Sequence, residues 1–104
     1  MKPRLRHKYG AVRTERNGRT YASKAEARYA DRLAVEQRTG TVLFWLEQCP
    51  IQLPGNTKYV VDFVVFDANG HVRFVDVKGM VTPMFALKKR QVEALYPIEI
   101  EVVS

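Results

Sequence analysis

The sequence has a single cysteine and no long apolar run. Cys49 has no second thiol with which to form an internal disulfide, and no set of spaced cysteines and histidines resembles a zinc site. The longest apolar runs are far shorter than the roughly 20 residues that span a bilayer, and the basic N-terminus lacks the apolar stretch of an export signal. These absences exclude a disulfide framework. They predict a cytoplasmic protein with no membrane partner.

Acidic residues are almost missing from the first quarter of the chain. Residues 1–24 contain eight Lys or Arg against Glu15 alone, whereas the remaining 80 residues contain nine basic and ten acidic groups. The net charge of +6 therefore originates in the first quarter. Such a segment suits a polyanion such as a nucleic-acid backbone, or serves only as a solvated tail that aids solubility. The candidate DNA contacts are Lys2, Arg4, Arg6, Lys8, Arg13, Arg16, Arg19 and Lys24.

The chain is predicted to form one domain preceded by a short arm. A chain of 104 residues has the size of one domain and can bury about two-thirds of its unfolded surface. Residues 1–8 are basic and contain almost no apolar side chains, which predicts a flexible arm. Residues 9–104 are predicted to form the single domain.

A basic β-hairpin and then a helix are expected at the start of this domain. The Asn-Gly dipeptide at positions 17–18 separates two strand-like pieces and favours a type I′ turn. Ser23 is a good N-cap, and Glu26 three residues later completes a capping box. Gly40 follows the last helical turn as a stop signal, so the helix is expected over residues 24–39.

The rest of the chain predicts a sheet and a second helix. Strands are expected over residues 41–48, with 51–53 able to continue the pairing, and over 58–66, 71–78 and 98–103. A turn at residues 67–70 joins the two central strands, and Thr82 with Pro83 begins a helix that stops before Pro97. The order strand, helix, strand implies a parallel crossover. The predicted fold class is α/β (α+β), a mixed β-sheet flanked by two helices with an N-terminal basic hairpin.

Two charged residues, Asp76 and Lys78, interrupt the apolar residues that follow Arg73 in the stretch RFVDVKG. Because side chains alternate across a strand, Asp76 and Lys78 share one face. By the same rule the even-numbered residues 60–66 of the preceding strand, Asp62 among them, share a face. If the two strands pair around the turn, Asp62 is expected nearly opposite Val77 and beside Asp76, with small bulges bringing both carboxylates to one edge of the sheet.

Two carboxylates in an apolar sheet repel each other and are costly to desolvate unless a cation compensates them. Mg²⁺ or Mn²⁺ suits this position, because hard divalent ions take oxygen ligands and often keep water for chemistry. Lys78 would then stand near a substrate phosphate, as phosphodiester hydrolysis requires. The alternative is a buried Asp76–Lys78 ion pair with Asp62 as a solvated strand end. The pair of aspartates on successive apolar strands, followed by Lys-Gly and a helix, favours the metal site.

The chain resembles the PD-(D/E)XK nuclease superfamily, whose restriction-endonuclease-like core is a helix, three or more strands, a helix and a strand. The resemblance covers residues 8–103 and rests on KYGAVRTERNGRTYASKAEARYADRL, YVVDFVVF and FVDVKG. Within the superfamily, the chain looks like small phage-encoded proteins catalogued as a domain of unknown function. The resemblance implies a Mg²⁺-dependent or Mn²⁺-dependent DNA endonuclease, similar to Holliday junction resolvases, that works in the cytoplasm of a bacterial host cell.

The resemblance also implies roles for individual residues. Asp62 matches the first acidic ligand of the family and Asp76 the second, and the Val77 carbonyl would be a main-chain ligand. Lys78 matches the lysine that positions water and offsets charge on the phosphate. Val61 stands where the family name has proline, at a position that is loosely kept across the superfamily.

Glu26 matches the acid that several branches of the family supply from the first helix, as a catalytic residue or a further metal ligand. It also has a purely structural interpretation, since a capping box with Ser23 is worth about 1 kcal/mol. The two roles are compatible, because a capping carboxylate can still reach toward a metal site.

Three functions remain open on the sequence. The first is an endonuclease that cuts branched DNA by structure, because a small chain has little surface for base recognition. The second is a non-catalytic nucleic-acid-binding accessory protein on the same fold. The third, suggested only by size and isoelectric point, is a ribosome- or RNA-associated protein. A homodimer would allow paired cuts, although no residue in the sequence establishes one.

Overall fold

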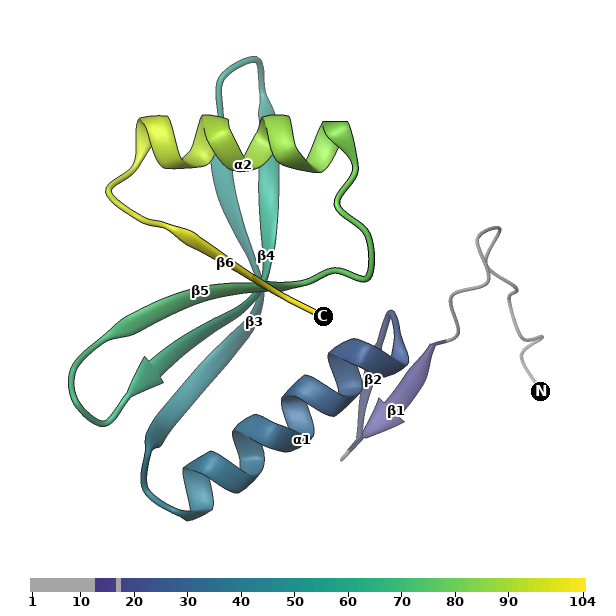
Figure 1. Cartoon of the computed structure of the whole chain (residues 1–104), viewed down its shortest axis with the longest axis vertical. Helices are drawn as coiled ribbons and strands as arrows, with labels where there is room; N and C mark the ends of the chain where they lie inside the picture. The colour runs from purple at the N-terminus through teal and green to yellow at the C-terminus, as the bar shows by residue number, and fades with distance from the viewer. Residues whose placement is uncertain (1–12, 17) are drawn as a thin grey trace.

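The computed structural model describes residues 13–16 and 18–104. The architecture is α+β, with an antiparallel hairpin and a mixed four-stranded sheet, and α1 and α2 lie at opposite ends of the view in Figure 1. Neither α1 nor α2, the helices of the described residues, is long and apolar enough to cross a membrane. The expected arm, residues 1–8, lies outside the described residues. In chain order the elements are β1 (Thr14–Arg16), β2 (Arg19–Tyr21), α1 (Lys24–Arg38), β3 (Val42–Leu53), β4 (Thr57–Asp67), β5 (Val72–Val77), α2 (Pro83–Leu95) and β6 (Ile100–Val103).

Helix α1 begins where its predicted N-cap lies. Ser23 has an extended backbone, and its Oγ accepts a hydrogen bond from the Glu26 N–H at 3.1 Å, which satisfies one of the free donors of the first turn. Gly40 adopts a φ of 90°, in the left-handed region that glycine enters without steric cost. The helix ends at Arg38, one residue before the end of the expected range 24–39.

The basic hairpin is tied to the sheet by one carboxylate. Its strands β1 and β2 are antiparallel and pair Arg16 with Arg19, which confirms the predicted hairpin. The Tyr21 hydroxyl and the Trp45 indole N–H both donate to Glu47 Oε2 at 2.9 Å. Arg19 Nη1 lies 3.1 Å from Glu47 Oε1. Glu47 of β3 therefore fixes the position of the hairpin relative to the sheet.

The four-stranded sheet has the order β3-β4-β5-β6. Its first three strands are antiparallel, and β5 and β6 are parallel, which confirms the predicted crossover through α2. Strand β3 is longer than the expected range 41–48 and continues through Pro50 to Leu53. It lies at the edge of the sheet, where the missing N–H of a proline is tolerated. Helix α2 starts after Thr82, whose Oγ1 accepts a hydrogen bond from the Phe85 N–H at 3.1 Å.

Side-chain alternation along β4 reverses at Asp62. Before Asp62, the odd-numbered residues Tyr59 and Val61 pack in the core under α2. After it, the odd-numbered residues Phe63 and Val65 pack in the core under α1. Asp62 lies across from Gln48 of β3, because the register pairs the residues on both sides of them. Gln48 has a φ of 53°, a left-handed conformation that is uncommon for a residue other than glycine. The expectation that even-numbered residues 60–66 share one face is therefore wrong, because the side chains of β4 exchange faces of the sheet at Asp62.

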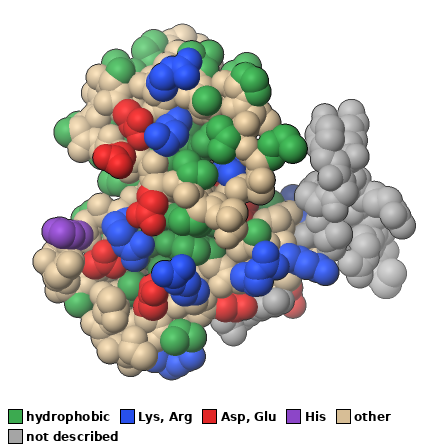
Figure 2. Space-filling model, viewed as in Figure 1, with side chains coloured by type: hydrophobic (Ala, Val, Ile, Leu, Met, Phe, Trp, Pro, Cys, Tyr) green, Lys and Arg blue, Asp and Glu red, His purple; other side chains and the backbone are tan. Residues whose placement is uncertain are grey.

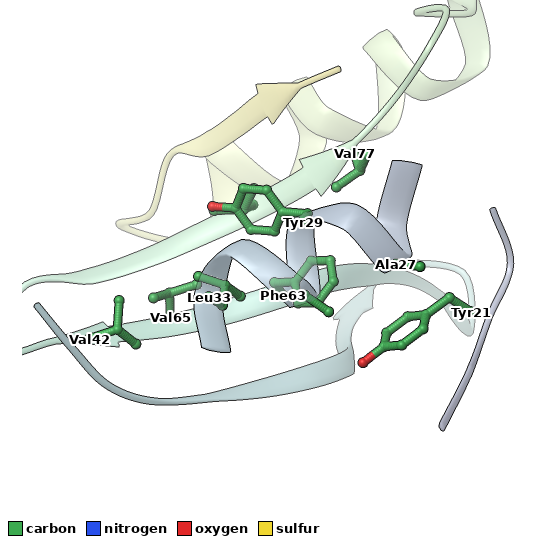
Figure 3. Packing of buried hydrophobic residues seen from close by; sticks show 10 residues of the cluster. Tyr21, Ala27, Tyr29, Leu33, Val42, Phe63, Val65 and Val77 are labelled. Carbon is green, nitrogen blue, oxygen red and sulfur yellow. The ribbon is translucent and has the colours of Figure 1, made fainter. Parts of the chain in front are cut away.

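The reversal separates two small apolar cores. In the core under α1, Leu33 and Phe63 are buried, and the ring of Tyr29 lies with its centroid 5.1 Å from that of Phe63 (Figure 3). The core under α2 contains Val61 and Val92, both fully buried. Because β4 contributes to both cores, the segment around Asp62 lies at their junction.

Candidate active site

The four residues expected to form the site converge at this junction. Asp62 lies in β4, Asp76 in β5, Lys78 directly after β5 and Glu26 in the first turn of α1. Asp62 and Asp76 are only 7% and 1% exposed. Glu26 is close enough to the other three for their charges to shift its pKa. The structure thus brings together side chains from three elements that are far apart in the sequence.

Asp62 and Asp76 lie across from each other where the pairing of β4 and β5 ends. The regular ladder stops one residue short of them, and the same register continued places the two aspartates opposite one another. The expectation that Asp62 lies nearly opposite Val77 is therefore wrong by one position. The physical reason is the turn, in which the Asp67 N–H donates to the His71 carbonyl at 2.9 Å, so that Asp67 lies opposite His71 and residues 68–70 form a three-residue loop.

Each aspartate is hydrogen-bonded to the backbone of the other strand. Asp76 Oδ1 accepts from the Asp62 N–H, and Asp62 Oδ2 accepts from the Val77 N–H, both at 2.9 Å. The carboxylates thus replace the ladder hydrogen bonds that β4 and β5 lack here. Asp76 Oδ2 also accepts from the Tyr59 hydroxyl, and Asp62 Oδ1 lies 3.4 Å from Gln48 Nε2. Each carboxylate oxygen has one protein donor and keeps capacity for a further partner.

Burial governs the charge state of the cluster. Desolvation is the main reason why the pKa of Asp62 is raised, and the hydrogen bond from Val77 and the charge of Lys78 oppose this effect. Desolvation, followed by the charge of Asp62, raises the pKa of Glu26 from 4.5 to about 7, while Lys78 again lowers it. Both shifts show that a further negative charge is costly at this junction and that a cation would favour ionisation.

Lys78 lies beside the aspartates without pairing with either of them. Among the described residues no ion pair within 4.0 Å joins Lys78 to Asp76 or Asp62. The Lys78 Nζ instead lies 5.0 Å from the centroid of the Phe85 ring, and its backbone N–H donates to the Val103 carbonyl at 2.8 Å. The alternative interpretation, a buried Asp76–Lys78 ion pair with Asp62 as a solvated strand end, is therefore wrong.

Sequence reasoning missed two residues that contact the aspartates, Gln48 and Tyr59. Tyr59 is one of several apolar residues along β4, and nothing in the pattern separates its hydroxyl from the core. Gln48 stands two residues before Pro50 in β3, which signals a local irregularity but not a partner. Both assignments depend on pairing between strands, which only the structure shows.

A family model matches almost the whole chain. The family described as "Protein of unknown function (DUF1064)" matches residues 6–102. The chain belongs to this family. A search of curated proteins and a search of solved structures each found no match. In this DUF1064 protein the matched range includes both helices and all four candidate site residues.

Among the described residues of this DUF1064 chain, the carboxylates of the candidate site are not arranged as a complete metal-binding site. Within residues 13–16 and 18–104, no group of three or more His, Cys, Asp or Glu side chains is arranged to hold an ion. One oxygen of Asp62 and one of Asp76 accept hydrogen bonds from backbone N–H groups instead. The donor set nevertheless fits a hard divalent cation, because Glu26 and the two aspartates supply only oxygen atoms and retain free lone pairs.

The expected DNA contacts are only partly described. Arg13, Arg19 and Lys24 are exposed, and Arg16 belongs to β1. Arg19 shares its guanidinium between solvent and Glu47, since its side chain is still 59% exposed in the ion pair. Its pKa is raised by the charge of Glu47, so it remains cationic. The other four expected contacts, Lys2, Arg4, Arg6 and Lys8, lie outside the described residues.

Proposed function

We propose that this protein is a divalent-metal-dependent DNA endonuclease of the PD-(D/E)XK type. The proposal is carried by the convergence of Glu26, Asp62 and Asp76 at a buried junction where neither aspartate has an ion-pair partner among the described residues. Buried carboxylates require a compensating charge, and Mg²⁺ or Mn²⁺ would supply it. Asp62, Asp76 and Glu26, with the Val77 carbonyl, would hold the ion.

The chemistry proposed is the addition of water across one P–O bond of the DNA backbone. When bound, the ion would act as a Lewis acid on the phosphoryl oxygen and lower the pKa of the attacking water. Lys78 would donate to the phosphate and stabilise the negative charge that develops in the transition state. Glu26, in the first turn of α1 beside the two aspartates, would orient the attacking water or help to hold a second ion.

The proposed substrate is DNA in the cytoplasm of a bacterial host cell. The exposed basic residues of the hairpin and the start of α1 would contact phosphates, which fixes the position of DNA without reading its sequence. Such a protein would select branched DNA by shape. A homodimer would place two such sites on one branched molecule and allow paired cuts.

The test is cleavage of supercoiled plasmid and of a four-way junction with Mg²⁺, Mn²⁺ or EDTA. Asp76→Asn and Lys78→Ala are expected to lose at least about 100-fold in rate, as removal of a group that stabilises transition-state charge does. Glu99→Gln, an exposed acid of the same charge outside the site, should cut at the wild-type rate. If the wild-type chain binds DNA and leaves every substrate intact with each metal, the protein is instead the non-catalytic nucleic-acid-binding accessory protein.

A further inference from the structure

The segment after Lys78 exposes large apolar side chains. Met80, Val81 and Met84 are 78%, 55% and 61% exposed, and Leu87, three residues after Met84 on the same helix face, is 44% exposed. Figure 2 shows hydrophobic side chains at several places on the surface of the α2 end, with basic and acidic side chains between them. Adjacent exposed apolar residues of this size are typical of a binding surface.

The charged residues within this segment are all basic, and one of them, Lys89, pairs with Glu93 at 3.0 Å. Residues 77–92 contain Lys78, Lys88, Lys89 and Arg90 and no Asp or Glu. A surface that is apolar and cationic complements a partner with flat apolar faces and an anionic backbone, which describes a nucleic acid with accessible bases. A second copy of this chain would meet the surface with the same positive charge, so charge complementarity favours the nucleic acid.

The position of the segment limits which bases it can meet. Three residues of chain span at most about 10 Å, so Val81 lies within that distance of Lys78 along the backbone. The proposed function sets Lys78 against the scissile phosphate, and the bases beside that phosphate are then within reach of Met80 and Val81. In continuous duplex the faces of these bases are covered by stacking, whereas at a branch, bulge or flap they are open. The unbranched thioether of methionine adapts to such irregular surfaces.

We propose that Met80, Val81 and Met84 form a contact surface for unstacked bases beside the cleaved phosphate, so that the protein selects branched, bulged or flapped DNA over continuous duplex. The proposal depends on the proposed function for the choice of DNA as substrate. It adds that unstacked bases are the recognised feature of the DNA and that Met80, Val81 and Met84 recognise them. Apolar side chains that insert at opened base steps are a known means of recognising distorted DNA.

The test measures binding in EDTA, where no cleavage is expected. The probes are a four-way junction and a bulged duplex, each with 2-aminopurine at the unstacked position, and a continuous duplex of equal length. Met80→Ser combined with Met84→Ser should weaken binding to the junction and the bulge about tenfold and remove the rise in 2-aminopurine fluorescence, because loss of base contacts costs about this much. Binding to continuous duplex should change less than about twofold, because phosphate contacts dominate there.

Leu43→Ser combined with Leu95→Ser is the matched control. These leucines are 57% and 53% exposed and lie in β3 and at the end of α2. The control should retain wild-type selectivity. The proposal is overturned if the methionine variant binds all three probes like the wild type, or if it only converts a dimer into a monomer by light scattering, which would assign the surface to a second copy. If the wild-type chain never cuts DNA but selectivity is still lost in the methionine variant, the nuclease proposal fails and the assignment of this surface to unstacked bases stands.

Discussion

Gln48 of β3 and Asp62 of β4 lie across from each other at the point where side-chain alternation reverses. The Gln48 Nε2 lies 3.4 Å from Asp62 Oδ1, and the Gln48 backbone has a φ of 53°. A residue other than glycine in this region costs on the order of 1 to 3 kcal/mol and persists only where its surroundings hold it. The strained residue thus contacts a carboxylate of the candidate site, which is where such strain is commonly retained.

Gln48→Gly should separate the stability of the fold from the function of the site. Glycine adopts positive φ without steric cost, so the free energy of unfolding is expected to rise by about 1 kcal/mol, as measured by urea denaturation. The Asp62 carboxylate would at the same time lose its amide partner. The proposed metal-dependent cleavage is therefore expected to fall while stability increases.

Gln52→Gly is the control for this substitution. Gln52 has the same side chain in the same strand and does not have a positive φ. Glycine there should destabilise the protein by about 0.5 to 1 kcal/mol through backbone entropy. Equal destabilisation by both substitutions would show that Gln48 is not strained.

The sequence predicted the elements of the fold well because their signals are local. The N-caps Ser23 and Thr82 act within three residues of themselves, and both start their helices as expected. The first hairpin and the crossover through α2 likewise follow from short-range patterns and chain order.

The geometry of the site was harder to predict because it depends on contacts between strands. The partnership of Gln48 with Asp62 and of Tyr59 with Asp76 joins residues 14 and 17 positions apart. The predicted register of β4 and β5 is wrong by one residue for a related reason, because the geometry of the turn between these strands sets the register. The reversal of alternation in β4 requires a left-handed residue in a neighbouring strand, which no pattern within β4 reveals.

In the metal-free protein, stability should decrease as pH rises from about 4.5 to 7. Burial raises the pKa of Glu26 from 4.5 to about 7, so the unfolded chain releases this proton at lower pH than the folded chain. The loss of unfolding free energy is absent below the pKa that Glu26 has in the unfolded chain. It is complete above the pKa that Glu26 has in the folded chain. Because water screens this partly exposed carboxyl, we expect about 1 to 2 kcal/mol of lost unfolding free energy.

Glu26→Gln tests this assignment by urea denaturation in EDTA. The variant should gain stability relative to wild type at pH 8 and show no such gain at pH 4.5. Part of the pH dependence should remain, because burial also raises the pKa of Asp62, with the same sign. A difference between variant and wild type that is constant over the whole pH range would contradict a raised pKa for Glu26.

Mg²⁺ or Mn²⁺ should stabilise the folded protein through Asp62 and Asp76. An ion that binds only the folded state adds about 2.7 kcal/mol at a concentration 100 times its dissociation constant, which a thermal melt detects readily. Asp62→Asn keeps the size of the side chain and removes the charge, so it should abolish the shift. Exposed Glu99→Gln should leave the shift intact. An equal shift in all three proteins would indicate unspecific binding to the surface.

Glu47→Ala should loosen the basic hairpin. The substitution removes the acceptor of the Tyr21 hydroxyl and the Trp45 indole N–H, and Tyr21 is only 6% exposed. A buried donor left without a partner costs about 1 to 3 kcal/mol. Trypsin should then cleave the hairpin faster than in the wild type. Glu36→Ala, which removes an exposed helical ion pair with Arg32, is the comparison and should cost less than about 0.5 kcal/mol.

Deletion of residues 1–8 should weaken DNA binding and reduce its dependence on salt. The segment contains four basic residues, Lys2, Arg4, Arg6 and Lys8. Each phosphate contact that releases a counterion adds about 0.9 to the slope of log K against log salt, so loss of all four should reduce the slope by up to about 3.6. Replacing the same four residues by Gln keeps the length of the chain and should have the same effect, since charge and not length carries the contact. An unchanged slope in both variants, measured by fluorescence anisotropy across a salt series, would assign DNA binding to Arg13, Arg19 and Lys24 of the described hairpin and helix.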